Sequence, residues 1–221
     1  MENFAKKLAI NNKIQKKSNE KTFPIVNLNK KLELIEKAYN ILNESIFLNV
    51  PIPPSGEWLL DNYYLVEEQF NSIKNELSLE KYKELPSING TSRILVLARK
   101  MVEYTDANIT EENLGIFLRA YQSKKSILMK ELWVMPIMLK IAIIEYISEI
   151  CEKILDSQLQ KFKVESLVER IIKNKSVQEQ NFLKYKNIKI DTEATAYVEH
   201  LIYSLKKYGK EGKKYTEILE E

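Results

Sequence analysis

The chain has 221 residues, 44% of them hydrophobic and 29% charged, which fits one ordinary globular domain. Its net charge of +3, carried mostly by lysine, is too small to indicate a nucleic-acid partner, because arginine is the better bidentate ligand of phosphate. A single cysteine, Cys151, and a single histidine, His200, exclude an intramolecular disulfide, a zinc site of several thiolates and a histidine metal cluster. We therefore expect no metal and no cofactor. We expect a buried, inert thiol at Cys151 and a structural or solvent-facing role for His200.

The first 21 residues predict a short basic helix followed by a polar hinge. Phe4 and Leu8 mark the apolar side of this helix, and lysines dominate the rest of the segment. Such a segment could attract an anionic membrane surface or a nucleic acid, but stacking aromatic residues are almost absent from it. We expect a solvated, partly mobile arm over residues 1–21 and a helical bundle over residues 22–221. No apolar secretory signal is visible at the N-terminus, so we expect a cytoplasmic location.

Apolar residues then recur at spacings of three and four, which indicates a series of helices. The predicted helices cover residues 29–48, 57–77, 79–85, 93–106, 111–122, 126–155, 164–172, 191–207 and 215–219. Asn89-Gly90 can join hairpin strands, but its helical flanks favour a loop between helices. Residues 174–190 are polar and stay unassigned, although residues 186–190 alternate like a strand. The fold class is all-α, a bundle of about eight or nine helices in which residues 132–155 are the most buried, and residues 191–221 form the C-terminal helices.

The central helix is the most apolar part of the chain. Its run from Leu132 to Ile144 contains Lys140 and is bounded by Glu131 and Glu145. A membrane span needs about 20 largely apolar residues, so we predict no transmembrane segment.

The helix over residues 57–77 has an apolar face and an unusually polar and aromatic flank. Leu59, Tyr63, Val66 and Phe70 share the face that we expect to point into the core. The flank carries Trp58, Asp61, Asn62 and Tyr64. Exposing tryptophan is unfavourable, so this choice of residues indicates specific contacts to other helices or to a ligand.

No motif in the sequence carries a known catalytic mechanism, and we assign no catalytic residue. A Gly-rich phosphate loop, a paired-histidine motif and a serine elbow are all absent from the sequence. Glycoside chemistry needs two carboxyl groups that face each other across a cleft. The adjacent pairs Glu67-Glu68 and Glu111-Glu112 point about 100° apart on a helix, so we assign them to solvated surfaces.

Aromatic rings are the usual platform for sugars, because a flat ring stacks on the apolar face of a pyranose. Trp58 and Tyr121 are the two aromatic residues that core packing explains least, whereas we place Tyr63 and Trp133 in the core. The alternative is that these rings belong to an interhelical polar network. We expect Asp61, Asn62, Arg119 and Gln122 to form such a network, with a buried ion pair between Asp61 and Arg119.

Six blocks of the sequence resemble, in the same order, a segment near the N-terminus of the bacterial cyclic β-1,2-glucan synthases. The longest is E-W-L-L-D-N-Y-Y-L-V-E-E-Q at residues 57–69, and R-I-L-V-L-A-R-K-M-V-E-Y-T-D follows at residues 93–106. The other blocks are E-L-P at 84–86, the segments 111–114 with 117–122, 131–133 with 136–139, and 198–201. In that family the segment precedes a membrane-embedded glycosyltransferase, a cyclisation domain and a phosphorylase-like domain, and the parent enzyme uses UDP-glucose.

The resemblance implies a non-catalytic N-terminal accessory domain or fragment of such a synthase, because 221 residues cannot hold the catalytic domains. Its expected partners are those catalytic domains and a β-1,2-glucan, and the parent enzyme would associate it with the membrane. The alternative is a stand-alone helical scaffold or protein-interaction module. The candidate residues for glucan or domain contact are Trp58, Asp61, Asn62, Tyr64, Arg119, Tyr121 and Gln122.

Overall fold

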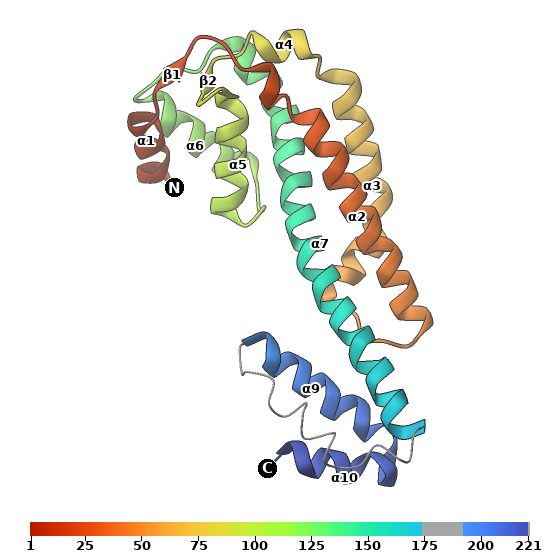
Figure 1. The fold of residues 1–221 in the computed structure, drawn as a ribbon. Helices are drawn as coiled ribbons and strands as arrows, with labels where there is room; N and C mark the ends of the chain where they lie inside the picture. Colours follow the sequence, from red (N-terminus) through yellow and green to blue (C-terminus); the bar gives the residue numbers. More distant parts are fainter. Residues whose placement is uncertain (174–191, 221) are drawn as a thin grey trace. The chain divides into compact units, whose positions relative to one another are not determined.

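The computed structural model describes residues 1–173 and 192–220, so the alternating stretch at 186–190 lies outside the described residues (Figure 1). The chain forms two compact units. The first unit contains Met1–Asn40 and Pro54–Glu152, and the second contains Ile41–Pro53 and the residues from Lys153 onward.

The all-α prediction is confirmed: the described part of the chain contains nine α-helices and one small sheet. The low glycine and proline content explains this result, since these residues interrupt helices most strongly. Two long helices, α2 (Pro24–Phe47) and α7 (Met129–Lys173), contribute residues to both units.

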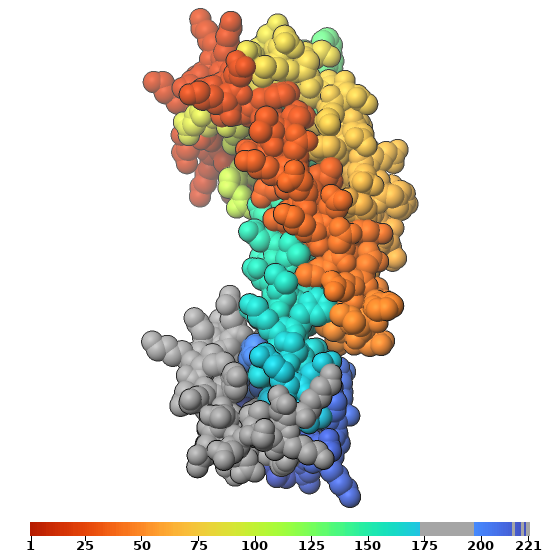
Figure 2. All heavy atoms as spheres, turned by 45° about the vertical axis from the view of Figure 1, so that its right-hand side comes forward, coloured from red at the N-terminus to blue at the C-terminus, as the bar shows by residue number. Residues whose placement is uncertain are grey.

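In the first unit, α2 and α3 (Pro54–Glu76) lie side by side (Figures 1 and 2). The ring of Tyr39 on α2 stacks on the ring of Tyr63 on α3, with 4.4 Å between centroids. Leu59, Val66 and Phe70 are buried as predicted. Tyr63 is only half-buried, because it packs at the edge of the two helices rather than in the core.

The N-terminal helix α1 (Glu2–Asn11) packs on α5 (Arg93–Thr105) and α6 (Glu111–Gln122). The ring of Phe4 stacks on Tyr104 at 4.8 Å and lies 6.4 Å from Phe117. Ala5 and Ala9 are completely buried. These apolar residues recur at a spacing of four and give α1 a face that packs on its neighbours.

A three-stranded antiparallel sheet replaces the loop that we expected around Asn89-Gly90. Its strands are β1 (Ile14–Gln15), β2 (Ser87–Ile88) and β3 (Thr91–Ser92). Ser87 pairs with Ser92 across the hairpin, and Ile14 pairs with Ile88. Asn89 and Gly90 have φ angles of 52° and 84°, which is the geometry of a two-residue turn with both central residues left-handed. The Asn-Gly signal was therefore a hairpin signal, and our preference for a loop between helices was wrong.

The short helix α4 (Leu79–Lys83) follows α3, and the Ser78 side chain caps it by accepting a hydrogen bond from the backbone N–H of Lys81. Helix α7 then begins at Met129 and continues for 45 residues. We predicted two helices, at 126–155 and 164–172. They are one helix because residues 156–163 contain neither glycine nor proline and nothing interrupts the backbone hydrogen bonds.

The second unit is built from the end of α2, the rest of α7, α9 (Thr192–Lys206) and α10 (Gly209–Glu220). Its core consists of Val164, Leu167, Val168, Ile171, Leu201, Leu205 and Tyr215. Helices α9 and α10 approach closely at Gly212, where an added Cβ would lie 1.9 Å from the carbonyl oxygen of Leu205. Only glycine fits this position without a backbone shift.

Candidate functional site

Four of the predicted site residues lie on the surface of α3. Trp58 is 50% exposed, Tyr64 is 63% exposed and Asp61 is also exposed. The side-chain amide of Asn62 donates a hydrogen bond to the carbonyl of Trp58, 2.8 Å away. These residues form an exposed polar and aromatic strip, which we call the α3 strip (Trp58, Asp61, Asn62 and Tyr64).

The other three predicted residues lie on α6 and do not join the α3 strip. Arg119 and Gln122 are exposed, whereas Tyr121 is completely buried. In Figure 1, α3 and α6 stand apart, and among the described residues no hydrogen bond or ion pair joins Asp61 to Arg119. The predicted Asp61–Arg119 network is therefore wrong. Each residue lies beside an apolar stripe, but the two helix faces do not meet.

A different pair makes the buried interhelical network. The guanidinium of Arg93, the first residue of α5, donates to both carboxylate oxygens of Glu131 in the first turn of α7, with 2.8 Å between Nε and Oε1. Both side chains are at most 4% exposed. The guanidinium also lies 5.9 Å from the ring centroid of Tyr121, so Tyr121 is a core residue and cannot contact a sugar directly. Burial raises the pKa of Tyr121, and the nearby Arg93 opposes this shift.

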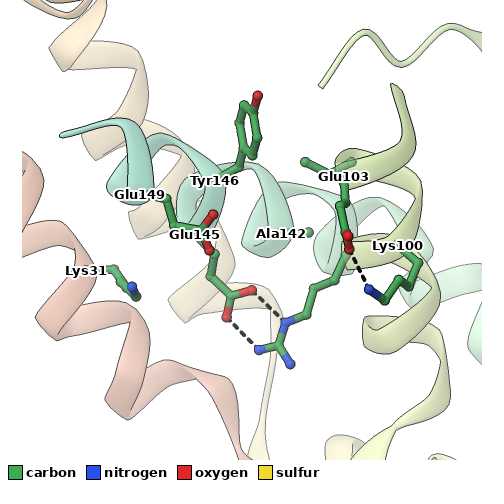
Figure 3. Close-up of a pocket in the computed structure, with 9 residues that line it drawn as sticks. Lys31, Lys100, Glu103, Ala142, Glu145, Tyr146 and Glu149 are labelled. Carbon is green, nitrogen blue, oxygen red and sulfur yellow. Dashed lines mark hydrogen bonds and ion pairs between the residues drawn. The ribbon is translucent and has the colours of Figure 1, made fainter. Parts of the chain in front are cut away.

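A surface hollow of the first unit, which we call the first hollow, surrounds a second arginine pair (Figure 3). Arg99 donates to Glu145 through Nε at 2.7 Å and through Nη2 at 2.6 Å. These hydrogen bonds raise the pKa of Arg99. The hollow measures about 590 Å³. Its charged lining residues are Lys31, Arg99, Lys100, Glu103, Glu145 and Glu149.

Two carboxylates of this first hollow are held in ion pairs. The Glu145 carboxylate already accepts two hydrogen bonds from Arg99, and Lys100 pairs with Glu103 at 2.6 Å. Neither carboxylate is a free base as it stands. Among the described residues, no group of three or more His, Cys, Asp and Glu side chains is placed to hold a metal.

The second hollow, of about 460 Å³, lies where the end of α3, α4 and the start of α7 come together. Trp133 lines it and is 75% exposed, so our placement of Trp133 in the core was wrong. One face of α7 points away from the core. It carries, at intervals of three and four residues, Trp133, Pro136 and Lys140. The buried face instead carries Glu131, Met135, Met138 and Ala142. The helical spacing of these residues separates the two faces. We did not use it, because nearly every residue of the segment is apolar and the two faces look alike by residue type.

The single cysteine and the single histidine both lie in partly or fully buried positions. Cys151 is 1% exposed, and burial raises the pKa of its thiol to about 12. His200 is half-buried in the second unit, where its Nε2 lies 3.5 Å from a carboxylate oxygen of Glu165 without a hydrogen bond. Burial lowers the pKa of His200, so the ring is neutral at pH 7.

Comparison with known proteins gives one informative relationship. The chain is 27% identical over 143 residues to the cyclic β-(1,2)-glucan synthase NdvB of Rhizobium meliloti. The chain is related to this glucan synthase. The matched segment covers 63% of the chain but only 5% of the synthase, so most of that protein has no counterpart here. No family model matches the chain. None of the helices within residues 1–173 and 192–220 is both long and apolar enough to cross a membrane.

Proposed function

We propose that the chain is a non-catalytic accessory segment of a cyclic β-1,2-glucan synthase-like protein. It would dock on the catalytic domains or guide the growing glucan, in the cytoplasm and next to the membrane that holds the parent enzyme. The observation that carries this proposal is the match over 143 residues to a glucan synthase that is far longer than the chain. Placement near the N-terminus of such an enzyme is part of the proposal.

The surface chemistry of the first unit supports a neutral, hydroxyl-rich ligand. Among the named charges of the first hollow, the bases Lys31, Arg99 and Lys100 balance the acids Glu103, Glu145 and Glu149. Two ion pairs, Arg99–Glu145 and Lys100–Glu103, orient four of these side chains, which can act as donors and acceptors for hydroxyl groups. The α3 strip adds two exposed aromatic rings, Trp58 and Tyr64.

A non-catalytic role predicts that the chain does not turn over UDP-glucose. Such turnover needs a diphosphate site and, commonly, acidic ligands for a metal, which we assign to other parts of the parent enzyme. The chain is incubated with UDP-glucose and a divalent metal, and UDP release is measured. We expect no release above background. Turnover that responds to substitutions in the chain contradicts this part of the proposal.

The decisive binding experiment titrates linear β-1,2-glucan into the whole chain and follows the backbone amide shifts. A second titration adds the purified catalytic region of the related synthase. We expect saturable shifts in at least one of the two titrations. The absence of amide shifts in both titrations contradicts the accessory role.

One observation favours the alternative of a protein-interaction module. In the second unit, Ile46, Phe47 and Leu48 are 53%, 84% and 50% exposed. Consecutive exposed apolar residues are typical of surfaces that bind another protein. If this role is correct, Phe47→Ser abolishes capture of the partner, and glucan shifts no amide.

A further inference from the structure

We propose that the hollow at Trp133 is a saccharide-binding subsite, in which the indole ring stacks on an uncharged pyranose of a β-linked glucan. This inference rests on the proposed function and assigns a site to it. Hydroxyl groups of the same sugar would bind the polar side chains around the ring. These side chains are Asn75, Glu76, Lys81, Glu84 and Lys130.

The exposure of Trp133 is the first argument. The residue is 75% exposed, although burying a large apolar side chain stabilises a protein by about 1.5–3 kcal/mol. Trp58, the other tryptophan, is 50% exposed. The Trp133 side chain on the outward face of α7 thus contributes little to the packing of the bundle. A ligand that covers the ring would explain why a tryptophan stands at this position.

The charge of the hollow is the second argument. Lys81 and Lys130 balance Glu76 and Glu84, so the four charges sum to zero. A phosphate or nucleotide site would carry an excess of positive charge. A neutral rim that offers both donors and acceptors matches the hydroxyl groups of an uncharged sugar.

Two of these polar groups are held in place before any ligand arrives. The Lys130 ammonium donates to the backbone carbonyl of Glu84 at 2.5 Å. The Glu76 carboxylate accepts a hydrogen bond from Ser72 and lies 3.8 Å from Lys140. Binding groups that are already oriented lose less conformational entropy when a ligand binds.

The apolar part of the hollow favours a sugar over a protein segment. Of the other apolar lining residues, Leu85 and Ile137 are at most 9% exposed and Val134 is half-buried, so Trp133 presents the largest exposed apolar side chain that a ligand could cover. Protein-binding hot spots instead cluster several anchors in desolvated pockets. A volume of about 460 Å³ lies in the ordinary range for small-ligand sites. The first hollow is lined by Tyr146, whose hydroxyl is hydrogen-bonded to Asp106, and by no tryptophan.

The experiment uses the two tryptophans separately, because the chain contains no others. In a Trp58→Phe variant, Trp133 is the single source of tryptophan fluorescence. In a Trp133→Phe variant, Trp58 is the single source. Short linear β-1,2-glucan oligosaccharides are titrated into each variant to millimolar concentration. We expect a saturable change of emission in Trp58→Phe and none in Trp133→Phe.

Calorimetry or amide shifts then measure the affinity without relying on the fluorophore. We expect Trp133→Ala to weaken glucan binding by about tenfold or more. A larger loss in Trp58→Ala would instead place the glucan on the α3 strip and contradict the assignment. Glu76→Gln keeps the shape of the rim and should weaken binding to an intermediate degree. Thermal unfolding checks that the variants fold, which we expect because Trp133 contributes little to the core.

Three further results would overturn the assignment, and they separate it from the proposed function. Wild-type affinity in Trp133→Ala means that glucan binds elsewhere, which leaves the accessory role standing. No saturable response in any protein means that the hollow binds no glucan, and the accessory role then depends on the titration with the catalytic region. Trp133 emission that shifts with protein concentration alone, without sugar, identifies the hollow as a protein-contact surface.

Discussion

Arg93 and Glu131 form a buried, two-pronged ion pair that connects the first residue of α5 to the first turn of α7. The same carboxylate accepts the backbone N–H of Leu128 at 2.9 Å, so Glu131 also closes the N-terminus of α7. A carboxylate three residues into a helix that reaches back to the preceding backbone is half of a capping box. One acidic residue thus fixes both the start of α7 and its register against α5.

Removing one partner of this pair should be strongly destabilising. We expect Arg93→Ala to lower the free energy of unfolding by about 3–5 kcal/mol, because it leaves the Glu131 carboxylate buried without its counter-charge. Urea unfolding, followed by the fluorescence of Trp58 and Trp133 in the same unit, measures the loss.

Arg119→Ala is the matched control for this prediction. The Arg119 side chain is exposed on α6, so its truncation should change the free energy by less than about 1 kcal/mol. Equal losses in the two variants would contradict the structural role assigned to the Arg93–Glu131 pair.

The sequence predicted the helices well wherever one apolar face recurs over several turns. The helices at residues 57–77 and 111–122 were placed to within a few residues, because apolar residues recur along both at helical spacing. The hairpin was missed because its strands have two residues each, and two residues show no alternation. The turn chemistry of Asn89-Gly90 was the stronger signal there.

The candidate site was less predictable than the fold, because it depends on which helix faces meet. Residue type favoured Trp133 in the core and Arg119 in an ion pair, yet both are exposed. Arg93 and Glu131 are buried because α5 and α7 bring their first turns together, which no local pattern indicates. Residue type alone does not reveal the Arg93–Glu131 pairing. The positions of Trp133 and Glu131 around the axis of α7, by contrast, do place the two residues on different faces of the helix.

Gly212 should tolerate no side chain. A Cβ at this position would lie 1.9 Å from the carbonyl oxygen of Leu205, so we expect Gly212→Ala to destabilise the contact between α9 and α10 by about 1–3 kcal/mol. Hydrogen exchange of peptides from α9 and α10 should become faster. Gly115→Ala in α6 is the control, because the nearest atoms there belong to the flexible Arg119 side chain. If exchange in Gly212→Ala is unchanged, the close contact at Gly212 does not contribute to the stability of α9 and α10.

Cys151 should be unreactive in the folded protein. The thiol is 1% exposed, and burial raises its pKa to about 12, so the nucleophilic thiolate is scarce at neutral pH. We expect no labelling by a thiol reagent in native buffer and complete labelling in denaturant. Fast labelling of the native chain would mean that the end of the first unit opens readily around this residue.

His200 should make the second unit less stable in mild acid. Burial lowers its pKa below the ordinary value of about 6.5, and Lys161 and Lys207 add to this shift while Glu165 opposes it. The unfolded chain therefore takes up the proton first as the pH falls. The stability that the neutral ring contributes is present above about pH 6.5 and is lost as the pH drops toward the folded pKa.

The measurement compares hydrogen exchange of α9 at about pH 7.5 and about pH 5.5, after correction for the intrinsic pH dependence of exchange. We expect weaker protection at the lower pH in the wild-type chain and a smaller difference in His200→Gln, whose side chain does not titrate. Glu199→Gln is the control, because it removes an exposed charge next to His200 in the sequence and leaves the ring unchanged. If His200→Gln keeps the full pH dependence, the loss in acid comes from other groups, and the buried ring has no part in it.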